Sequence, residues 1–375
     1  MIPPGDRIGS LTTVTHPRVE RRRRLAEALT GARLDALAVA HLPNVRCLPG
    51  FTGSNAVFLF SGGRGVLYTD PRYTLQARQE CDVPVRIVAE GPLWAEAARD
   101  LRKRAPRVLG AEASHVSHGQ WQTLARALGR AVRLKDASGI VEKLRMRKDE
   151  EEIEAIRRAV NLAAKAFAKA IRKARPGIAE SALAAEIDHQ MRLLGAGGPA
   201  FETIAAAGER SALPHARPSA RKLEAGELLL VDMGASWNGY ASDMTRVAHL
   251  GEPTPAAQRL YDAVLEAQLA ALAAVRPGVT AGEVDAAARR VLRQRGLGKL
   301  FTHSTGHGLG LEIHEAPRLG RLDATPLEPG MVITIEPGAY QPGFGGVRIE
   351  DTVLVTAAGA ETLTPTSKEF LVLPS

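Results

Sequence analysis

Residues 228–247 have the sequence LLLVDMGASWNGYASDMTRV, in which two apolar runs flank the dipeptide Asn238-Gly239. Asn-Gly between two such runs is the strongest short signal of a β-hairpin with a type I′ turn. A two-residue turn places Asp232 opposite Thr245 and puts Asp243 on the same face as Asp232, about 7–8 Å away. A β-bulge before the turn would break this register. The stretch therefore predicts an antiparallel hairpin with two carboxylates on one face.

Further acids interrupt apolar runs nearer the carboxyl terminus, and a histidine lies between glycines. With the hairpin acids, the set is Asp232, Asp243, His307, Glu336 and Glu350. An unpaired charge in a buried strand costs several kcal/mol, so each acid needs a partner. An arginine could supply that partner for any single acid. Four acids and a histidine together indicate a metal site instead.

The charge of this set favours two metal ions. Four ionised carboxylates in one pocket repel one another, whereas two divalent cations bring the set near neutrality. Oxygen donors with one imidazole and no thiolate favour Mn²⁺, with Co²⁺ or Zn²⁺ as alternatives, over a structural zinc site. A metal pair activates water and polarises a carbonyl group, so the chemistry indicated is hydrolysis. His307 alone would be typical of a structural histidine, but His303 and His314 in the same stretch favour a site.

The length of the chain predicts two domains, because 375 residues exceed the about 250–300 at which single cores stop growing. Helix and strand signals alternate to about residue 140, which indicates an α/β domain. A long charged helix over 149–174 then changes the pattern, so we place the boundary between domains 1–142 and 143–375. Helices over 179–194, 255–275 and 281–295 alternate with strands in the second domain. This order predicts an α+β fold in which a curved antiparallel sheet carries the acids.

Composition excludes several classes of partner. The net charge is +8, but the basic residues are scattered over separate helices and aromatic residues are only 4%, so we expect no nucleic-acid ligand. Two cysteines give no disulfide framework and fit a reducing compartment. No apolar run reaches the roughly 18 residues of a membrane span, and the amino terminus has no apolar leader. We therefore expect a cytoplasmic protein without a membrane partner.

Several motifs resemble the pita-bread metallopeptidases, specifically the proline-directed branch of Xaa-Pro aminopeptidase and Xaa-Pro dipeptidase (prolidase). They are DMG at 232–234, YASDMTR at 240–246, HSTGHG at 303–308, IEPG at 335–338 and GVRIED at 346–351. Residues 44–46, 50–55 and 70–73 resemble the creatinase-type amino-terminal domain of the same branch. The resemblance implies a carboxyl-terminal pita-bread fold preceded by an α/β creatinase-like domain.

The resemblance also assigns the metal ligands. It implies that Asp232 and Asp243 bind one metal, that His307 and Glu336 bind the other, and that Asp243 and Glu350 bridge the two. Glu336 would also accept the proton of the attacking water. Two metal ions, manganese before cobalt or zinc, are thus the implied cofactors.

Other positions match catalytic and pocket residues of that branch. His215 matches the histidine that steadies the scissile group and the tetrahedral intermediate, and His314 matches one that contacts the substrate carbonyl. His303, Tyr340 and Arg348 match pocket or supporting positions, and a salt bridge to a ligand carboxylate explains Arg348 equally well. In this branch the amino-terminal domain of a partner subunit can cover the site, so a homodimer is implied. Cys47 and Pro49 depart from the usual residues there, which leaves the substrate contacts open.

The function implied is metal-dependent hydrolysis of the bond before proline, releasing the amino-terminal residue of Xaa-Pro peptides or dipeptides. That bond is a tertiary amide without an N–H, so its cleavage needs a dedicated pocket. Two alternatives are a noncatalytic pita-bread binding protein and a creatinase-like amidinohydrolase, neither of which needs the acid cluster. Methionine aminopeptidase shares the second domain but normally lacks the first. The choice between dipeptides and longer peptides stays open.

Overall fold

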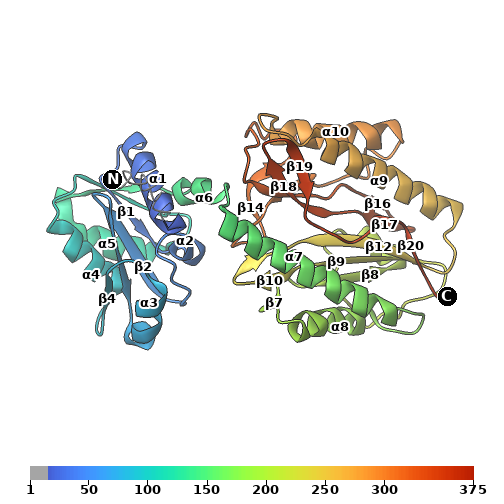
Figure 1. The fold of residues 1–375 in the computed structure, drawn as a ribbon, viewed down its shortest axis with the longest axis horizontal. Coiled ribbons are helices and arrows are strands. Elements are labelled where there is room, and N and C mark those ends of the chain that lie inside the picture. The colour runs from blue at the N-terminus through green and yellow to red at the C-terminus, as the bar shows by residue number, and fades with distance from the viewer. Residues whose placement is uncertain (1–15) are drawn as a thin grey trace, which may run out of the picture. The chain divides into compact units, whose positions relative to one another are not determined.

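The computed structural model describes residues 16–375, which divide into two compact units (Figure 1). The first unit ends at Leu144, and the second spans Arg145–Ser375. The predicted absence of an apolar leader concerns the residues before 16, which lie outside the described part. No helix from residue 16 onward has both the length and the apolar character needed to cross a membrane.

The first unit is a mixed six-stranded sheet with helices on both faces. The strand order is β4-β3-β2-β1-β5-β6, with β1–β2 antiparallel and β1–β5 parallel. The strands are β1 (Ala36–Val39), β2 (Ala56–Ser61), β3 (Arg64–Thr69), β4 (Val85–Ile87), β5 (Val108–Ala111) and β6 (Arg133–Asp136). The helices are α1 (Pro17–Gly31), α2 (Leu42–Cys47), α3 (Thr74–Glu80), α4 (Leu93–Arg102), α5 (His118–Leu128) and α6 (Ile140–Arg145), which crosses the unit boundary. Alternate residues of β1 enter two different apolar clusters, as expected for a covered sheet.

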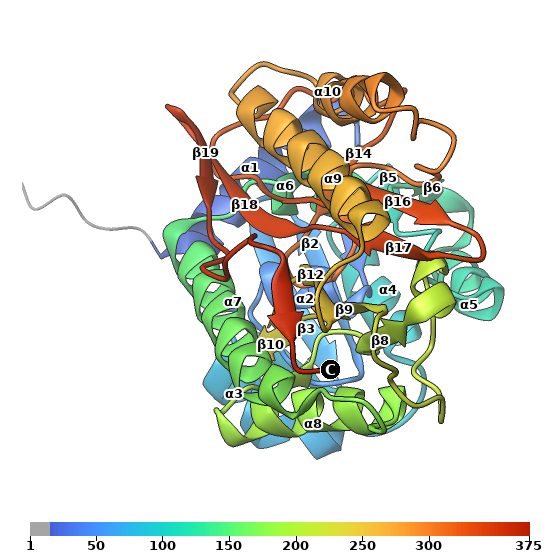
Figure 2. The same cartoon turned by 90° about the vertical axis from the view of Figure 1, so that its right-hand side faces the viewer.

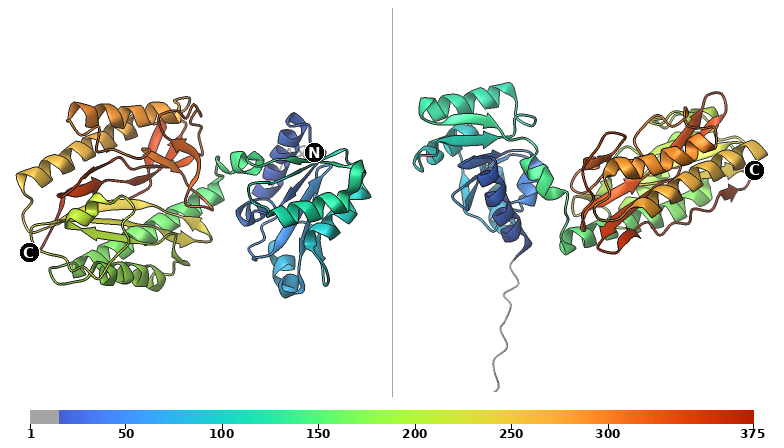
Figure 3. Two further views of the ribbon diagram at one scale, coloured as in Figure 1. Left: turned by 180° about the vertical axis from the view of Figure 1, so that it is seen from behind. Right: turned by 90° about the horizontal axis from the view of Figure 1, so that it is seen from above.

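Two pairs of helices enclose the strands of the second unit (Figures 2 and 3). One pair is α7 (Glu150–Ala170) with α8 (Glu180–Leu193), and the other is α9 (Pro255–Ala274) with α10 (Ala281–Gln294). A capping box of Asp149 and Glu152 starts α7. The helix ends before the predicted residue 174 because a 3₁₀ turn tightens the chain at Ile171–Lys173.

The strands of the second unit form several ladders that are antiparallel except for β12–β20. The main sheets have the orders β20-β12-β9-β8 and β14-β13-β15-β18-β19, with smaller sheets β11-β10-β7 and β16-β17. The strands are β7 (Gly198–Pro199), β8 (Ile204–Ala207), β9 (Leu228–Met233), β10 (Ala235–Trp237), β11 (Tyr240–Ala241), β12 (Met244–Leu250), β13 (Gly306–Gly308), β14 (Glu315–Leu319), β15 (Val332–Ile335), β16 (Gly338–Gln341), β17 (Gly345–Arg348), β18 (Asp351–Thr356), β19 (Gly359–Thr362) and β20 (Leu371–Leu373). The prediction of an α/β unit followed by a unit of helices and antiparallel sheets is confirmed.

The predicted hairpin register is also confirmed. Asp232 pairs with Thr245, and the turn residues Asn238 and Gly239 have φ angles of 45° and 65°, as a type I′ turn requires. Residues 229, 231 and 233 of β9 pack into the cluster under α7 and α8. Residues 228 and 230 pack into the cluster under α9 and α10. Because strand side chains alternate, Asp232 points to the side of α9 and α10, where the second large sheet also packs.

Candidate metal centre

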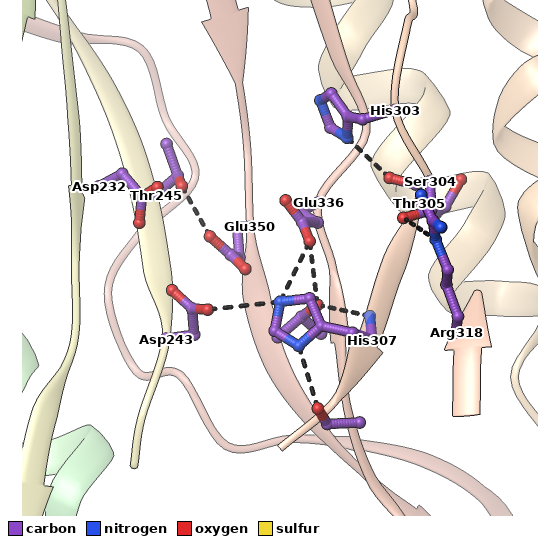
Figure 4. Close-up of polar contacts among 12 residues, drawn as sticks. Asp232, Asp243, Thr245, His303, Ser304, Thr305, His307, Arg318, Glu336 and Glu350 are labelled. Carbon is purple, nitrogen blue, oxygen red and sulfur yellow. Dashed lines mark hydrogen bonds and ion pairs between the residues drawn. The ribbon is translucent and has the colours of Figure 1, made fainter. Parts of the chain in front are cut away.

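The acids and the histidine singled out from the sequence come from different strands but line one cavity of about 510 Å³ (Figure 4). Asp232 lies on β9, Asp243 lies just before β12, and His307 lies on β13. Glu336 directly follows β15, and Glu350 lies between β17 and β18. The fold thus gathers in one place five side chains that span more than a hundred positions of the sequence.

His307 is placed to bind a cation through Nε2. Its Nδ1 lies 3.0 Å from the carbonyl oxygen of Gly308, so Nδ1 carries the hydrogen and Nε2 keeps its lone pair. Nε2 lies 3.6 Å from Asp243 Oδ2 and 3.4 Å from Glu336 Oε1 (Figure 4). One ligand atom each from Asp243, His307 and Glu350 lie within 4.8 Å of one another. This spacing brings oxygen and nitrogen donors together around one point.

Three buried carboxylate oxygens in this cluster support the presence of cations. Asp232 Oδ1, Asp243 Oδ1 and Glu350 Oε1 accept no hydrogen bond from any residue between 16 and 375. Such an oxygen loses its hydration without compensation unless a cation contacts it. The second oxygen of Glu350 accepts a 2.6 Å hydrogen bond from Thr245 Oγ1, which fixes how that carboxylate is turned. The donor set therefore fits divalent metal ions.

Burial and mutual repulsion hold protons on these acids when no cation is bound. Burial first, and then the neighbouring carboxylates, raise the pKa values of Asp243 and Glu350 well above their usual range. Burial also raises the pKa of Glu336 to about 7, with Asp232 adding to the shift and Arg348 opposing it. Burial lowers the pKa of His307, which favours the neutral imidazole that a metal needs. Metal ions and protons therefore compete for the same oxygens.

This competition predicts how stability depends on pH. A carboxyl group whose pKa is higher in the folded chain stabilises the metal-free protein below its unfolded pKa. For Glu336 that contribution disappears as the pH rises from about 4.5 towards 7. We expect the increase in Tm on adding Mn²⁺ to be larger at pH 7.5 than at pH 5.5, by about 5 °C or more. Calorimetry of the chelated and reloaded protein measures this, and an equal increase at both values would contradict it.

The three other histidines singled out from the sequence reach the same cavity. His215 lies in the loop after the 3₁₀ turn Gly208–Ala212, and His314 lies just before β14. The ring of His314 meets that of His307 edge-on, with 4.5 Å between centroids. Burial lowers the pKa of His314 and lowers that of His303 to about 4, so both rings are neutral near pH 7. Neutral imidazoles can donate a hydrogen bond to a developing negative charge.

Arg348 connects Asp232 with the histidine side of the cavity. Its guanidinium donates to Asp232 Oδ2 at 2.5 Å, to Tyr340 Oη at 2.8 Å and to the carbonyl of Pro214 at 3.2 Å. The sequence left two explanations for Arg348, a pocket position and a salt bridge to a ligand carboxylate. In the structure Arg348 both lines the cavity and forms a salt bridge to Asp232. Tyr340, which we expected in the pocket, lies one layer behind the wall. Its hydroxyl is held there by Arg348 and by His303 Nε2, 2.8 Å away.

Sequence reasoning did not find several lining residues, chiefly Arg318. Arg318 pairs directly opposite His307 in the β13–β14 ladder, so the two side chains share a face. Its Nε donates only a 3.4 Å hydrogen bond to Ser304 Oγ (Figure 4), and no acid between residues 16 and 375 forms an ion pair with it. The apolar part of the wall is formed by Phe201, Ile204, Pro214 and Ile313. The sequence held one signal for Arg318: it lies an even number of residues after His314, so in a strand both side chains would point to the same face. Pro317, however, argues against a strand at this position.

Comparison with known proteins covers both units. The profile of Metallopeptidase family M24 matches residues 154–357, and that of the Creatinase/Prolidase N-terminal domain matches residues 21–147. An Xaa-Pro dipeptidase of Pyrococcus horikoshii is 37% identical over 353 residues, which are 94% of this chain and 99% of that protein. The structure of an Xaa-Pro dipeptidase from Bacillus anthracis matches with a TM-score of 0.92 and 38% identity, covering 95% of this chain and all (100%) of that one. The structure of an X-Pro aminopeptidase from Thermotoga maritima matches with a TM-score of 0.87 and 36% identity, covering 92% of this chain and 100% of that one.

Proposed function

Because the chain belongs to Metallopeptidase family M24, we propose that it hydrolyses the peptide bond before proline and that Xaa-Pro dipeptides are its preferred substrates. The observation that carries this proposal is the group of buried carboxylate oxygens without hydrogen-bond donors beside His307 Nε2. A noncatalytic binding protein has no need for such a group. A creatinase-like amidinohydrolase works without metal and has no use for it either.

The positions of the side chains support the roles that the family resemblance implies. Asp232, Asp243, His307, Glu336 and Glu350 would hold two divalent ions, which supply Lewis-acid activation of water and of the scissile carbonyl. Glu336 accepts the proton of the attacking water and returns it towards the leaving proline nitrogen. His215 and His314 donate hydrogen bonds to the oxyanion that forms on the carbonyl oxygen. Arg348 keeps Asp232 turned towards the centre while also holding the Pro214 carbonyl beside His215.

The wall of the cavity gives a preference for the residue before proline. Phe201, Ile204 and Ile313 form an apolar surface that can receive an aliphatic side chain, because burying such a side chain releases water. The neutral rings of His303 and His314 add no charge to this surface near pH 7. We therefore propose that Xaa is apolar in the best substrates.

Arg318 favours dipeptides over longer peptides. In Xaa-Pro the proline carries the terminal carboxylate, one residue from the scissile bond, whereas in longer peptides that charge lies further away. Arg318 is an exposed cation on the same face as His307 and lines the same cavity. A guanidinium is suited to bind a carboxylate through two hydrogen bonds. The relatives named Xaa-Pro dipeptidase support the same assignment.

A comparison of substrates tests both the cleavage before proline and the preference for dipeptides. We expect the chelated protein, once supplied with Mn²⁺, to cleave Ala-Pro faster than Ala-Pro-Ala and to leave Ala-Ala-Ala intact. Arg318→Gln should lower kcat/KM for Ala-Pro by about 10- to 100-fold, since a charged hydrogen-bonded pair is lost. The same change should leave Ala-Pro-amide, which has no carboxylate, nearly unaffected.

Arg321→Gln serves as the matched control, because Arg321 is another exposed arginine close in sequence that does not line the metal cavity. If Arg318→Gln lowered kcat/KM equally for Ala-Pro and Ala-Pro-amide, the proposed preference for dipeptides would be wrong. The proposed peptidase activity would stand. Cleavage of Ala-Ala-Ala at the rate of Ala-Pro would contradict the specificity for proline.

Three finer features belong to this proposal. Manganese is the metal we expect from the oxygen-rich donor set. A homodimer is expected from the resemblance to the proline-directed branch. A reducing compartment, and hence the cytoplasm, is consistent with Cys47 and Cys81, which form no disulfide within residues 16–375.

A further inference from the structure

A buried ion cluster is centred on Glu315, which lines the cavity beside His314 but is not one of the proposed metal ligands. Glu315, the first residue of β14, has a side chain that is only 6% exposed. Arg145 Nη2 lies 2.5 Å from its Oε1, and Lys148 Nζ lies 3.1 Å from its Oε2. The side chains of these two cations are 3% and 2% exposed. A charged group this deep persists only with such partners, so the cluster fixes the place of the Glu315 carboxylate.

The same carboxylate holds the loop that carries His314. Its Oε1 accepts a 3.1 Å hydrogen bond from the backbone N–H of Glu312. The backbone of Gly310 packs so closely against it that a Cβ there would come within 2.8 Å of Oε1. Gly308 pairs with Glu315 in the β13–β14 ladder, so residues 309–314 form the connection between two fixed points. Arg145 Nη2 also lies 2.8 Å from Glu312 Oε2, so the loop is held both by the Glu315 carboxylate and by a cation that this carboxylate binds.

The position of this loop matters for the reaction because Ile313 and His314 enter the cavity from it. His314 itself is exposed, and its one ring contact within residues 16–375 is with His307. Its own side chain thus has little to fix where its nitrogens point. The restraint on His314 comes instead from the backbone, through the neighbouring carboxylate.

We propose that Glu315, held by Arg145 and Lys148, is a positioning residue that sets the place of His314 over the metal cavity. The inference rests on the proposed function only where it concerns turnover; the position of the loop is measurable without substrate. Displacement of a catalytic group by about 1 Å can lower a rate by about 100-fold. A role confined to stability would not act through His314 in particular.

The test combines a kinetic cycle with amide hydrogen exchange. Glu315→Gln keeps the size and the acceptor oxygen but removes the charge that Arg145 and Lys148 bind. We expect kcat for Ala-Pro to fall about 10- to 100-fold while KM and metal content stay unchanged. In the background of His314→Ala, the same change should lower kcat no further, because its effect acts through that ring. Independent, additive losses would overturn the proposal, as would loss of the metals.

Hydrogen exchange separates a failure of this inference from a failure of the proposed function. Amide exchange over residues 309–314 should be about tenfold faster in Glu315→Gln, with the rest of the second unit unchanged. Unchanged exchange in that segment would overturn the inference even if the wild-type chain proved to cleave no Xaa-Pro bond. Glu361→Gln is the matched control, since it removes a surface ion pair with Arg157 far from the loop in sequence. If Glu315→Gln does not fold, Lys148→Met takes its place, because it leaves Arg145 bound to the Glu315 carboxylate. We then expect the same changes in kcat and in amide exchange, but of smaller magnitude.

Discussion

Asp243→Ala should abolish metal uptake and lower the rate of Ala-Pro hydrolysis by at least about 1000-fold. Asp243 supplies one of the three possible ligand atoms that lie within 4.8 Å of one another, and a buried oxygen without a hydrogen-bond donor among residues 16–375. No neighbouring acid can replace it, because Glu350 is held by Thr245 and Asp232 by Arg348. Elemental analysis of the dialysed variant and its turnover measure the two effects.

The same substitution should raise the Tm of the metal-free protein. Burial and the charges of Glu350 and Asp232 raise the pKa of Asp243, which means that its ionised form is destabilised in the metal-free fold. Removing the carboxyl group removes the cost of burying it, whether it is protonated or ionised, while the increase in Tm on adding Mn²⁺ disappears. Asp188→Ala, which removes a half-buried carboxyl bonded to Thr203 outside the cavity, should keep the metals and the activity. Full turnover in Asp243→Ala would refute a mechanism that depends on two metals.

His215→Ala should keep both metals and lose mainly kcat, by about 100- to 1000-fold, as for the loss of one oxyanion donor. His215 lines the cavity but contributes no atom to the group of Asp243, His307 and Glu350. KM should change little, because the hydrogen bond to the oxyanion forms only as the carbonyl is attacked. Steady-state kinetics and metal content, measured on the same preparation, check this expectation.

His189→Ala provides the control, since His189 is an exposed histidine on α8 in the same unit and lies outside the cavity. If metal content fell together with the rate in His215→Ala, the histidine would be a ligand, and its role as an oxyanion donor would be wrong. A rise in KM with kcat unchanged would instead make it a residue that binds the ground state of the substrate.

Local patterns in the sequence were sufficient for the hairpin and for the chemical identity of the cluster. Asn238-Gly239 fixes its own turn, and the turn fixes the pairing of Asp232 with Thr245, because register follows from turn length. Acids that interrupt apolar runs are visible without any knowledge of the fold. The same local signals located most helices, although α2 and α6, which have only six residues each, were too short to show a period.

The sequence by itself therefore determined which acids and which histidine form the cluster that we propose to bind metal, and which hairpin presents the first two. Only the tertiary structure decided what surrounds them: Arg318 opposite His307, Tyr340 behind Arg348, and Glu315 beneath the loop of His314. The reason is that turn and strand signals depend on neighbours in sequence, whereas these contacts join residues whose separation depends on how whole strands pair and pack. Arg145 and Glu315 are 170 positions apart, and no local pattern in either segment indicates the other.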